Sequence, residues 1–214
     1  MELIATVHFG EKYANAFWNG NQMVFGDGDG ELFNRFTIDL DVIGHELAHG
    51  VTQYEAGIIY KDQAGALNES YSDVFGSMIK QYFLKQTVDQ ADWLIGKNLL
   101  IGEQYALRSM KEPGKAYVNH PLLGTDPQPA KMSDYVDLEP WEDNGGVHIN
   151  SGIPNYAFYV TAMEIGGYSW EKAGLIWYKA LKKLGTNPDF KKAAETTINV
   201  AEKLFGPDLS LIHI

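Results

Sequence analysis

The chain contains no cysteine among its 214 residues, so it can form neither a disulfide nor a thiolate metal site. Basic residues are scarce: 17 Lys and Arg stand against 28 Asp and Glu, which gives a formal net charge of −11 at pH 7. Because binding to a phosphate backbone requires a basic face, this balance argues against a nucleic-acid partner. Apolar runs are short, and none reaches the roughly 18 residues of a membrane-spanning helix, so we expect no membrane segment.

What remains is the composition of a soluble globular protein, with 45% hydrophobic and 21% charged residues. The first residues, MELIATVHFG, lack the basic and apolar regions of a signal peptide. The last six residues, LSLIHI, continue no helical period, and we interpret residues 207–214 as a truncation end or scar. His213 therefore takes no part in the functional interpretation.

The order of patterns predicts strands first and helices afterwards. An Asn19-Gly20 pair between apolar runs indicates a hairpin within a β-rich stretch at residues 1–38. Residues 109–150 show little periodicity and are predicted to be mostly loop. Apolar periods near 3.6 predict helices over residues 41–54, 65–84, 153–165, 169–184 and 188–205. This order predicts an α+β fold with two lobes.

The stretch DVIGHELAHGVTQ at residues 41–53 carries the clearest chemical pattern. On a helix, His45 and His49 share one face and can direct their imidazoles at a single metal ion. Two neutral nitrogens suit zinc, and Glu46 lies about 100° further round the helix, where it can act as a general base. This is the spacing of the HExxH metalloprotease motif. Chance would produce such a pattern in about one chain in fifty of this composition, so a third ligand is needed.

The following helix supplies one in the stretch GALNESYSD at residues 65–73. Glu69 and Asp73 lie four residues apart inside an otherwise apolar helix, where unpaired carboxylates are costly. A solvated acidic face is the simpler reading of such a pair. Here Glu69 can be the third ligand, while Asp73 accepts the second N–H of a ligand histidine.

These motifs resemble those of the thermolysin family of zinc metalloendopeptidases, nearest its calcium-poor, protealysin-like branch. The resemblance extends to NAFWNG (15–20), GDGDG (26–30), AGIIY (56–60), LRSM (107–110) and DNGGVHINSGI (143–153). It implies a two-lobed zincin fold with the active-site helix between the lobes. Residues 1–60 would be the remainder of a β-rich lobe with this helix, and residues 61–206 a helical lobe, with parts of both lobes missing.

The resemblance also implies roles for individual residues. His45, His49 and Glu69 would bind one catalytic zinc, and Glu46 would activate water for attack on a peptide carbonyl. His148, held by Asp143, and Tyr60 would stabilise the oxyanion.

Substrate contacts follow from the same resemblance. Asn15 and the backbone of Ala16 would hold the peptide main chain, and Arg108 would bind a substrate carbonyl oxygen. An apolar primed-side pocket, favouring bulky residues such as Leu or Phe, would be formed by Phe33, Phe36, Val42, Ile95, Leu99 and Leu107. Plain core packing is the alternative for these six residues.

One part of the pattern departs from relatives that have a double calcium site. Asp41 and Asp92 match two of the expected ligands, but Lys80, Leu94 and Lys97 stand where carboxylates are expected. We therefore expect ion pairs in place of calcium.

The resulting hypothesis is a zinc-dependent metalloendopeptidase that acts on peptide or protein substrates. From the family we expect a propeptide in the precursor, secretion from a bacterium and a monomeric chain. The alternatives are a catalytically inactive relative that binds peptides, and a structural metal protein with four protein ligands and no open position.

Overall fold

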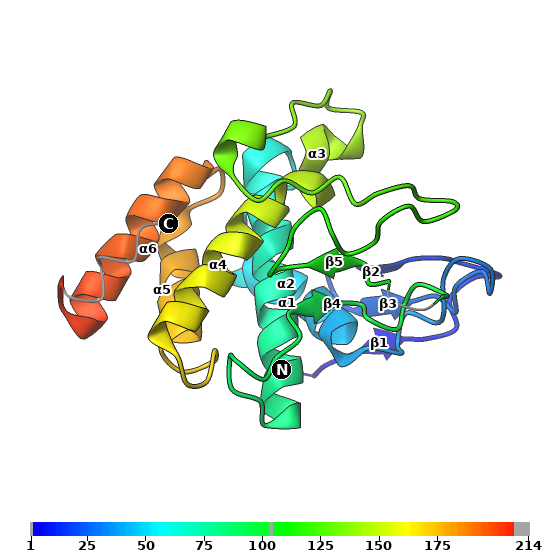
Figure 1. Ribbon diagram of the computed structural model, residues 1–214, viewed down its shortest axis with the longest axis horizontal. Coiled ribbons are helices and arrows are strands. Elements are labelled where there is room, and N and C mark those ends of the chain that lie inside the picture. The colour runs from blue at the N-terminus through cyan, green and yellow to red at the C-terminus, as the bar shows by residue number, and fades with distance from the viewer. Residues whose placement is uncertain (1, 103–104, 208–214) are drawn as a thin grey trace.

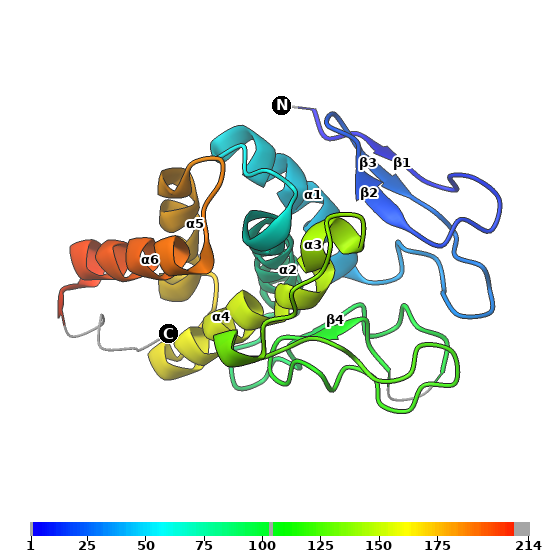
Figure 2. The same cartoon turned by 90° about the horizontal axis from the view of Figure 1, so that it is seen from above.

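Strands and helices separate to opposite sides of the molecule in the computed structural model, which describes residues 2–102 and 105–207 (Figures 1 and 2). The first sheet contains β1 (Ala5–Thr6), β2 (Ala16–Trp18) and β3 (Met23–Phe25) in the order β1-β3-β2. Strand β3 pairs in parallel with β1 and antiparallel with β2, with Ala16 opposite Phe25. The predicted hairpin is confirmed: the Asn19 N–H donates to the Gln22 carbonyl over 3.0 Å, closing the β2–β3 turn.

Helix α1 (Leu40–Glu55) lies between this sheet and helix α2 (Asp62–Leu84), as Figure 2 shows. The two helices approach most closely where Gly44 faces Gly76. A Cβ on Gly76 would lie 2.3 Å from the carbonyl oxygen of Asp41, so a larger residue would push the helices apart. This close packing brings the middle of α1 against the first half of α2, the two segments with the metal-ligand pattern.

A second, two-stranded sheet was not expected from the sequence. Strands β4 (Leu94–Ile95) and β5 (Arg108–Ser109) pair antiparallel, with Ile95 opposite Arg108. Two residues are too few to show an alternating pattern, and the partners are distant in sequence. The pairing matters because it sets Arg108 against Asp73, in the middle of α2.

The C-terminal half is helical, as predicted. Helices α4 (Gly152–Ile165), α5 (Lys172–Leu184) and α6 (Phe190–Phe205) begin and end within a few residues of the predicted limits. They pack on α2 through a core that includes Val74, Phe158, Ile176 and Leu181, each at most 1% exposed. A smaller core joins the sheet to α1 through Phe25, Phe36, Val42 and Leu99.

The prediction of mostly loop for residues 109–150 is confirmed, apart from short regular elements. The stretch contains a 3₁₀ turn, η1 (Met132–Asp134), and helix α3 (Asp143–Asn150). Helix α3 opens with a left-handed turn: φ is +50° at Asp143, +51° at Asn144, +84° at Gly145 and +81° at Gly146. Successive L-residues rarely adopt this conformation, and the two glycines make it possible here.

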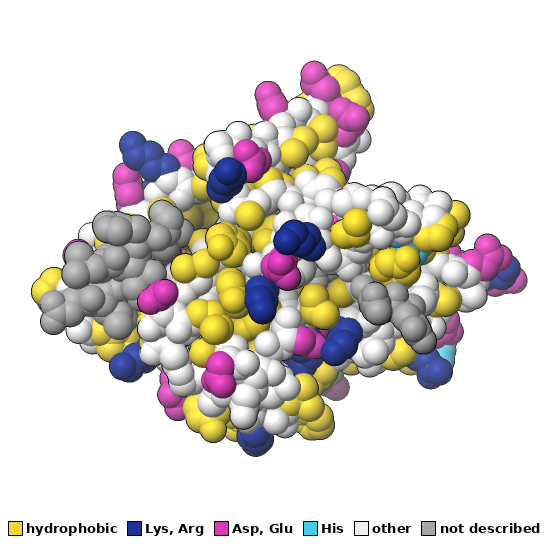
Figure 3. All heavy atoms as spheres, in the orientation of Figure 1, with side chains coloured by type: hydrophobic (Ala, Val, Ile, Leu, Met, Phe, Trp, Pro, Cys, Tyr) yellow, Lys and Arg dark blue, Asp and Glu magenta, His cyan; other side chains and the backbone are white. Residues whose placement is uncertain are grey.

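On the face seen in Figure 3, acidic and basic side chains are scattered among apolar ones and form no basic patch. Within residues 2–102 and 105–207, no helix is long and apolar enough to cross a membrane. The predicted division after residue 60 stays a prediction, and the interpretation of LSLIHI falls on residues outside the described ones.

Candidate metal centre and cleft

Helix α1 directs two imidazoles at one point. His45 and His49 lie one turn apart, and their Nε2 atoms are 3.0 Å from each other. The Nδ1–H of His45 donates to Asp73 Oδ1 over 2.8 Å, and the Nδ1–H of His49 donates to Asn68 Oδ1 over 2.9 Å. These bonds place a proton on each Nδ1, so that Nε2 is the atom that each ring directs into the space between them and offers to a metal ion.

Helix α2 brings the carboxylate of Glu69 to the same point. Its Oε2 lies 3.4 Å from His45 Nε2, and its Oε1 lies 3.4 Å from His49 Nε2. The three ligand atoms all lie within 4.8 Å of one another, and Glu69 is 0% exposed. Among the described residues, Glu69 Oε2 has no hydrogen-bond partner. A buried carboxylate oxygen facing two imidazole lone pairs fits a cation with nitrogen and oxygen ligands, as zinc is.

Proton binding at this cluster is strongly coupled. Burial disfavours the charged form of His45, but the charges of Glu69 and Asp73 raise the pKa of His45 to about 10. Burial, together with the charge on His45, lowers the pKa of His49 to about 4. The pair therefore holds one positive charge against Glu69, and a divalent cation can take the place of that proton.

A tyrosine and a third histidine face the cluster from the other side. The hydroxyl of Tyr60 donates to Glu69 Oε1 and lies 3.0 Å from His148 Nε2. His148 Nε2 is 3.6 Å from Glu69 Oε1, and its Nδ1 lies 2.5 Å from Asp143 Oδ1. Burial alone would lower the pKa of His148, but the negative charges of Glu69 and Asp143 raise it. The arrangement favours a protonated imidazole that directs an N–H toward the cluster.

The left-handed turn of α3 fixes the position of His148. Asp143 accepts from the backbone N–H of His148 over 2.8 Å as well as from its ring, so both ends of the turn are tied together. Gly145 packs directly on Asp62 at the start of α2, where a Cβ would lie 2.2 Å from Asp62 Oδ1. The close contact joins the turn to the helix that carries Glu69.

Glu46 lies beside the cluster and belongs to the wall of a cleft of about 780 Å³. It is 6% exposed, and burial raises the pKa of its carboxyl to about 7. Among the described residues no side chain makes a hydrogen bond or ion pair with it, so the carboxylate is available to a water molecule. A carboxyl that titrates near neutral pH suits a general base.

Two family models match the chain. The catalytic domain of the thermolysin metallopeptidases matches residues 1–53, and their alpha-helical domain matches residues 56–212. The chain belongs to the thermolysin metallopeptidase family. The fold is α+β and thermolysin-like, as predicted.

Several relatives of this thermolysin-like chain are similar over nearly all of it. An extracellular metalloprotease of Pectobacterium carotovorum subsp. carotovorum is 61% identical over 209 residues, which is 96% of this chain and 59% of the relative. Protease PrtS of Photorhabdus sp. (strain Az29) is 55% identical, covering 98% of this chain and 57% of its own length. The solved precursor of protealysin from Serratia proteamaculans aligns with a TM-score of 0.93 and 61% identity, covering 98% of this chain and 66% of that one. The chain thus spans less than two thirds of these relatives.

The cleft of this family member gathers most of the residues that the sequence suggested. Asp73, Asp143 and Leu99 do not line it: the first two stand behind His45 and His148, and Leu99 is 0% exposed in the core that joins the sheet to α1. The predicted residues that do line the cleft, besides the metal cluster and Glu46, are Asn15, Ala16, Phe33, Phe36, Val42, Tyr60, Ile95, Leu107, Arg108 and His148.

Arg108 lies in the cleft wall but is bound from behind. Its Nε donates to Asp73 Oδ2 and its Nη2 to Asp73 Oδ1, each over 2.7 Å. The same carboxylate holds the ring of His45, so Asp73 links Arg108 to a candidate metal ligand. The sequence predicts the contact of Asp73 with a ligand histidine but not its contact with Arg108.

At the position where calcium ligands are expected, an ammonium group lies among oxygens. Lys80 Nζ is 2.7 Å from Asp41 Oδ2, 3.0 Å from Asp92 Oδ1 and 2.7 Å from the carbonyl oxygen of Leu94. Burial disfavours the charge on Lys80, but the two carboxylates raise its pKa. Lys97 pairs with Asp92 over 3.4 Å at the surface and is not paired with Asp41.

Three residues that support the site were not singled out from the sequence. Asn68 holds His49, Asn155 of α4 donates to Asp73, and Gln128 donates to the backbone carbonyl of His148 over 2.7 Å. Asn68 has a sequence signal, since it is part of the GALNESYSD segment next to Glu69. The other two come from distant segments and have none.

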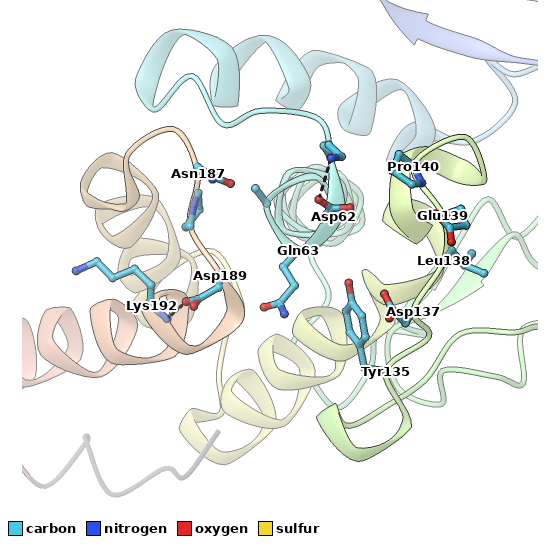
Figure 4. A pocket seen from close by; sticks show the side chains of 13 residues that line it. Asp62, Gln63, Tyr135, Asp137, Leu138, Glu139, Pro140, Asn187, Asp189 and Lys192 are labelled. Carbon is cyan, nitrogen blue, oxygen red and sulfur yellow. Dashed lines mark hydrogen bonds and ion pairs between the residues drawn. The ribbon is translucent and has the colours of Figure 1, made fainter.

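A second cavity, of about 830 Å³, is separate from the cleft (Figure 4). It is polar, and none of the predicted site residues lines it. Its wall includes Asp62, Tyr135, Asp137, Glu139 and Asp189. We therefore place the chemistry in the cleft.

Proposed function

We propose that this chain carries the active site of a zinc-dependent metalloendopeptidase. The observation that supports this most directly is the convergence of His45, His49 and the buried Glu69 on one point in the cleft wall. A zinc ion held by two imidazoles and a carboxylate acts as a Lewis acid toward water and a peptide carbonyl.

The side chains around that point supply proton transfer and stabilisation of the oxyanion. Glu46 takes the proton of the attacking water and passes it to the leaving amine. His148 and Tyr60 donate hydrogen bonds to the oxyanion that develops on the substrate carbonyl. Asp143 holds His148 in the tautomer that presents its Nε2–H, which is why this carboxylate matters although it does not line the cleft.

Substrate binding is assigned to the residues of the cleft wall. The amide of Asn15 and the backbone of Ala16 hold the peptide main chain. Arg108 keeps one terminal nitrogen for a substrate carbonyl oxygen, because its Nε and Nη2 are both taken by Asp73. The apolar wall suits a bulky apolar side chain on the primed side, and it is lined by Phe33, Phe36, Val42, Ile95 and Leu107.

We also propose that ion pairs replace calcium at Lys80, and that the protein is secreted with a propeptide. The first point rests on the three oxygens around Lys80 Nζ. The others rest on the names of relatives: one is called an extracellular metalloprotease, and the solved neighbour is the precursor of protealysin.

Glu46→Gln in the full-length protein tests the mechanism. We expect kcat/KM on an apolar peptide substrate to fall by roughly 10²- to 10⁴-fold, the usual contribution of a general base, while bound zinc per chain stays at the wild-type value. Glu55→Gln is the matched control, since Glu55 lies on the same helix and pairs with Lys182 away from the cleft. It should leave kcat/KM unchanged.

Each result has a clear reading. Peptidase activity that survives Glu46→Gln would overturn the assigned base. A wild-type protein that binds zinc and peptide but cleaves nothing would be the inactive peptide-binding relative. Zinc that remains bound without an exchangeable water would indicate a structural metal site.

A further inference from the structure

Asn155, on α4, makes a buried contact that reaches the metal cluster from behind. The residue is 0% exposed, and its Nδ2 donates to Asp73 Oδ2 over 2.8 Å. It does not line the cleft, and its Oδ1 has no hydrogen-bond partner among the described residues. Its one strong polar contact is therefore with Asp73.

Asp73 is fully occupied by its partners. Its Oδ1 accepts from His45 Nδ1 at 2.8 Å and from Arg108 Nη2 at 2.7 Å, while Oδ2 accepts from Arg108 Nε at 2.7 Å and from Asn155. A carboxylate has about four acceptor positions, so the Asn155 amide fills the last one. The carboxylate is 0% exposed, and no described side chain besides these three bonds to it.

The three partners differ in how far they are fixed. His45 and Arg108 both line the cleft, so each is in contact with whatever binds there. Rotation of a carboxylate about its Cβ–Cγ bond is soft, and on its own Asp73 would follow whichever of the two moved. Asn155 touches neither the metal cluster nor the cleft and comes from a helix that packs in the core.

We propose that Asn155 is a positioning residue that fixes the plane of the Asp73 carboxylate and so orients His45 and Arg108 together. The proposal rests on the proposed function, because it concerns the same site. Loss of the amide leaves Asp73 free to turn, which weakens the hold on the His45 ring and loosens the guanidinium of Arg108. Metal binding and substrate binding are therefore both affected by one residue that touches neither.

Asn155→Leu removes the amide and keeps a side chain with the same number and branching of heavy atoms. Zinc affinity of the folded protein is measured by competition with a chromophoric chelator, and we expect it to fall about tenfold, the lower end of the effect of residues behind a metal ligand. KM should rise more than kcat falls, since Arg108 binds substrate. Thr161→Val is the matched control: Thr161 is 5% exposed on the same helix, with an unpartnered hydroxyl, and should leave both quantities unchanged.

A double-mutant cycle separates positioning from general stability. If Asn155 acts through Asp73, then Asn155→Leu should change zinc affinity little in an Asp73→Asn background. If Asn155→Leu does not fold, Asn155→Ser, whose hydroxyl is too short to span the contact, replaces it in the cycle. Equal zinc affinity in variant and wild type, with only a lower Tm of the zinc-free protein, would overturn the proposal.

Full additivity in the cycle would overturn it as well. The measurement of zinc affinity needs no peptidase activity, so it decides the role of Asn155 even for a protein that binds zinc and fails to cleave. The failure of the proposed function and the failure of this inference are thus distinguishable.

Discussion

Replacing Lys80 with methionine tests whether one ammonium group holds α1, α2 and the β4 segment together. The substitution keeps the apolar stem and removes the charge that lies 2.7 Å from Asp41 Oδ2 and 3.0 Å from Asp92 Oδ1. The side chain of Asp41 is 0% exposed, so its carboxylate cannot regain water in the variant. Removing one partner of a buried ion pair costs about 3–5 kcal/mol, because an uncompensated charge is left behind.

The expected change is large enough to measure in two ways. Urea denaturation of the full-length protein should show that Lys80→Met lowers the free energy of unfolding by about 3–5 kcal/mol. At about 2–4 °C per kcal/mol for a domain of this size, Tm should fall by about 6–20 °C. Lys80→Met combined with Asp41→Asn should recover most of this loss, since no buried charge is then unpaired.

The surface lysine of the same cluster provides the control. Lys97 lies 3.4 Å from Asp92 and its side chain is 56% exposed, so Lys97→Met should cost less than about 1 kcal/mol. If Lys80→Met is no more destabilising than Lys97→Met, the ammonium does not hold these segments together and the reasoning is refuted.

The ion pairs of Lys80 with Asp41 and Asp92 also predict that stability depends on pH. Burial would raise the pKa of Asp92, but the charges of Lys80 and Lys97 lower it below its usual value of 3.8. A carboxyl with a lowered folded pKa adds stability above its unfolded pKa and loses it as pH falls through the folded one. Burial raises the pKa of Asp41 although the charge of Lys80 opposes this, so Asp41 takes up a proton before Asp92 as pH falls. The stability difference between wild type and Lys80→Met should therefore be largest near neutral pH and shrink as first Asp41 and then Asp92 is protonated.

Two further predictions concern the site. Asn68→Ala should weaken zinc binding about 10- to 100-fold in the chelator competition, because the Nδ1–H of His49 loses its acceptor; unchanged affinity would mean that this bond does not orient the ring. Gly145→Ala should lower both kcat and the free energy of unfolding, the latter by more than the about 1 kcal/mol of a strained backbone alone, since its Cβ would lie 2.2 Å from Asp62 Oδ1. Gly166→Ala, at φ +73° with open space around it, measures the backbone cost by itself, and equal losses in the two variants would contradict the predicted clash.

The sequence is informative where the structure is locally periodic. The helices are predictable because their apolar stripes recur every 3.6 residues, and the candidate ligands His45 and His49 because one helical turn separates them. The β4–β5 pair escaped prediction because two residues carry no alternation. The left-handed turn falls within a predicted loop, since a glycine pair indicates a turn without specifying its handedness.

Contacts between segments that are distant in the sequence were likewise not predictable. Glu69 and Asp73 were predicted because a buried helix face with two carboxylates is unusual. Nothing in the sequence connects either with Asn155, which α4 brings to Asp73 only after the helices have packed. The resemblance predicts that Arg108 contacts substrate. Its two hydrogen bonds to Asp73, however, depend on the β4–β5 pairing, which the sequence does not predict.

The left-handed turn before His148 also has a genetic consequence. Gly145 and Gly146 have φ of +84° and +81°, and a Cβ on either would lie within 2.8 Å of a neighbouring side chain. Any base change in a glycine codon that alters the encoded residue introduces a side chain. Missense variation at these two codons should therefore be tolerated far less than at exposed glycines such as Gly185. Selection on the orientation of one histidine would then be visible in codons that specify no functional group.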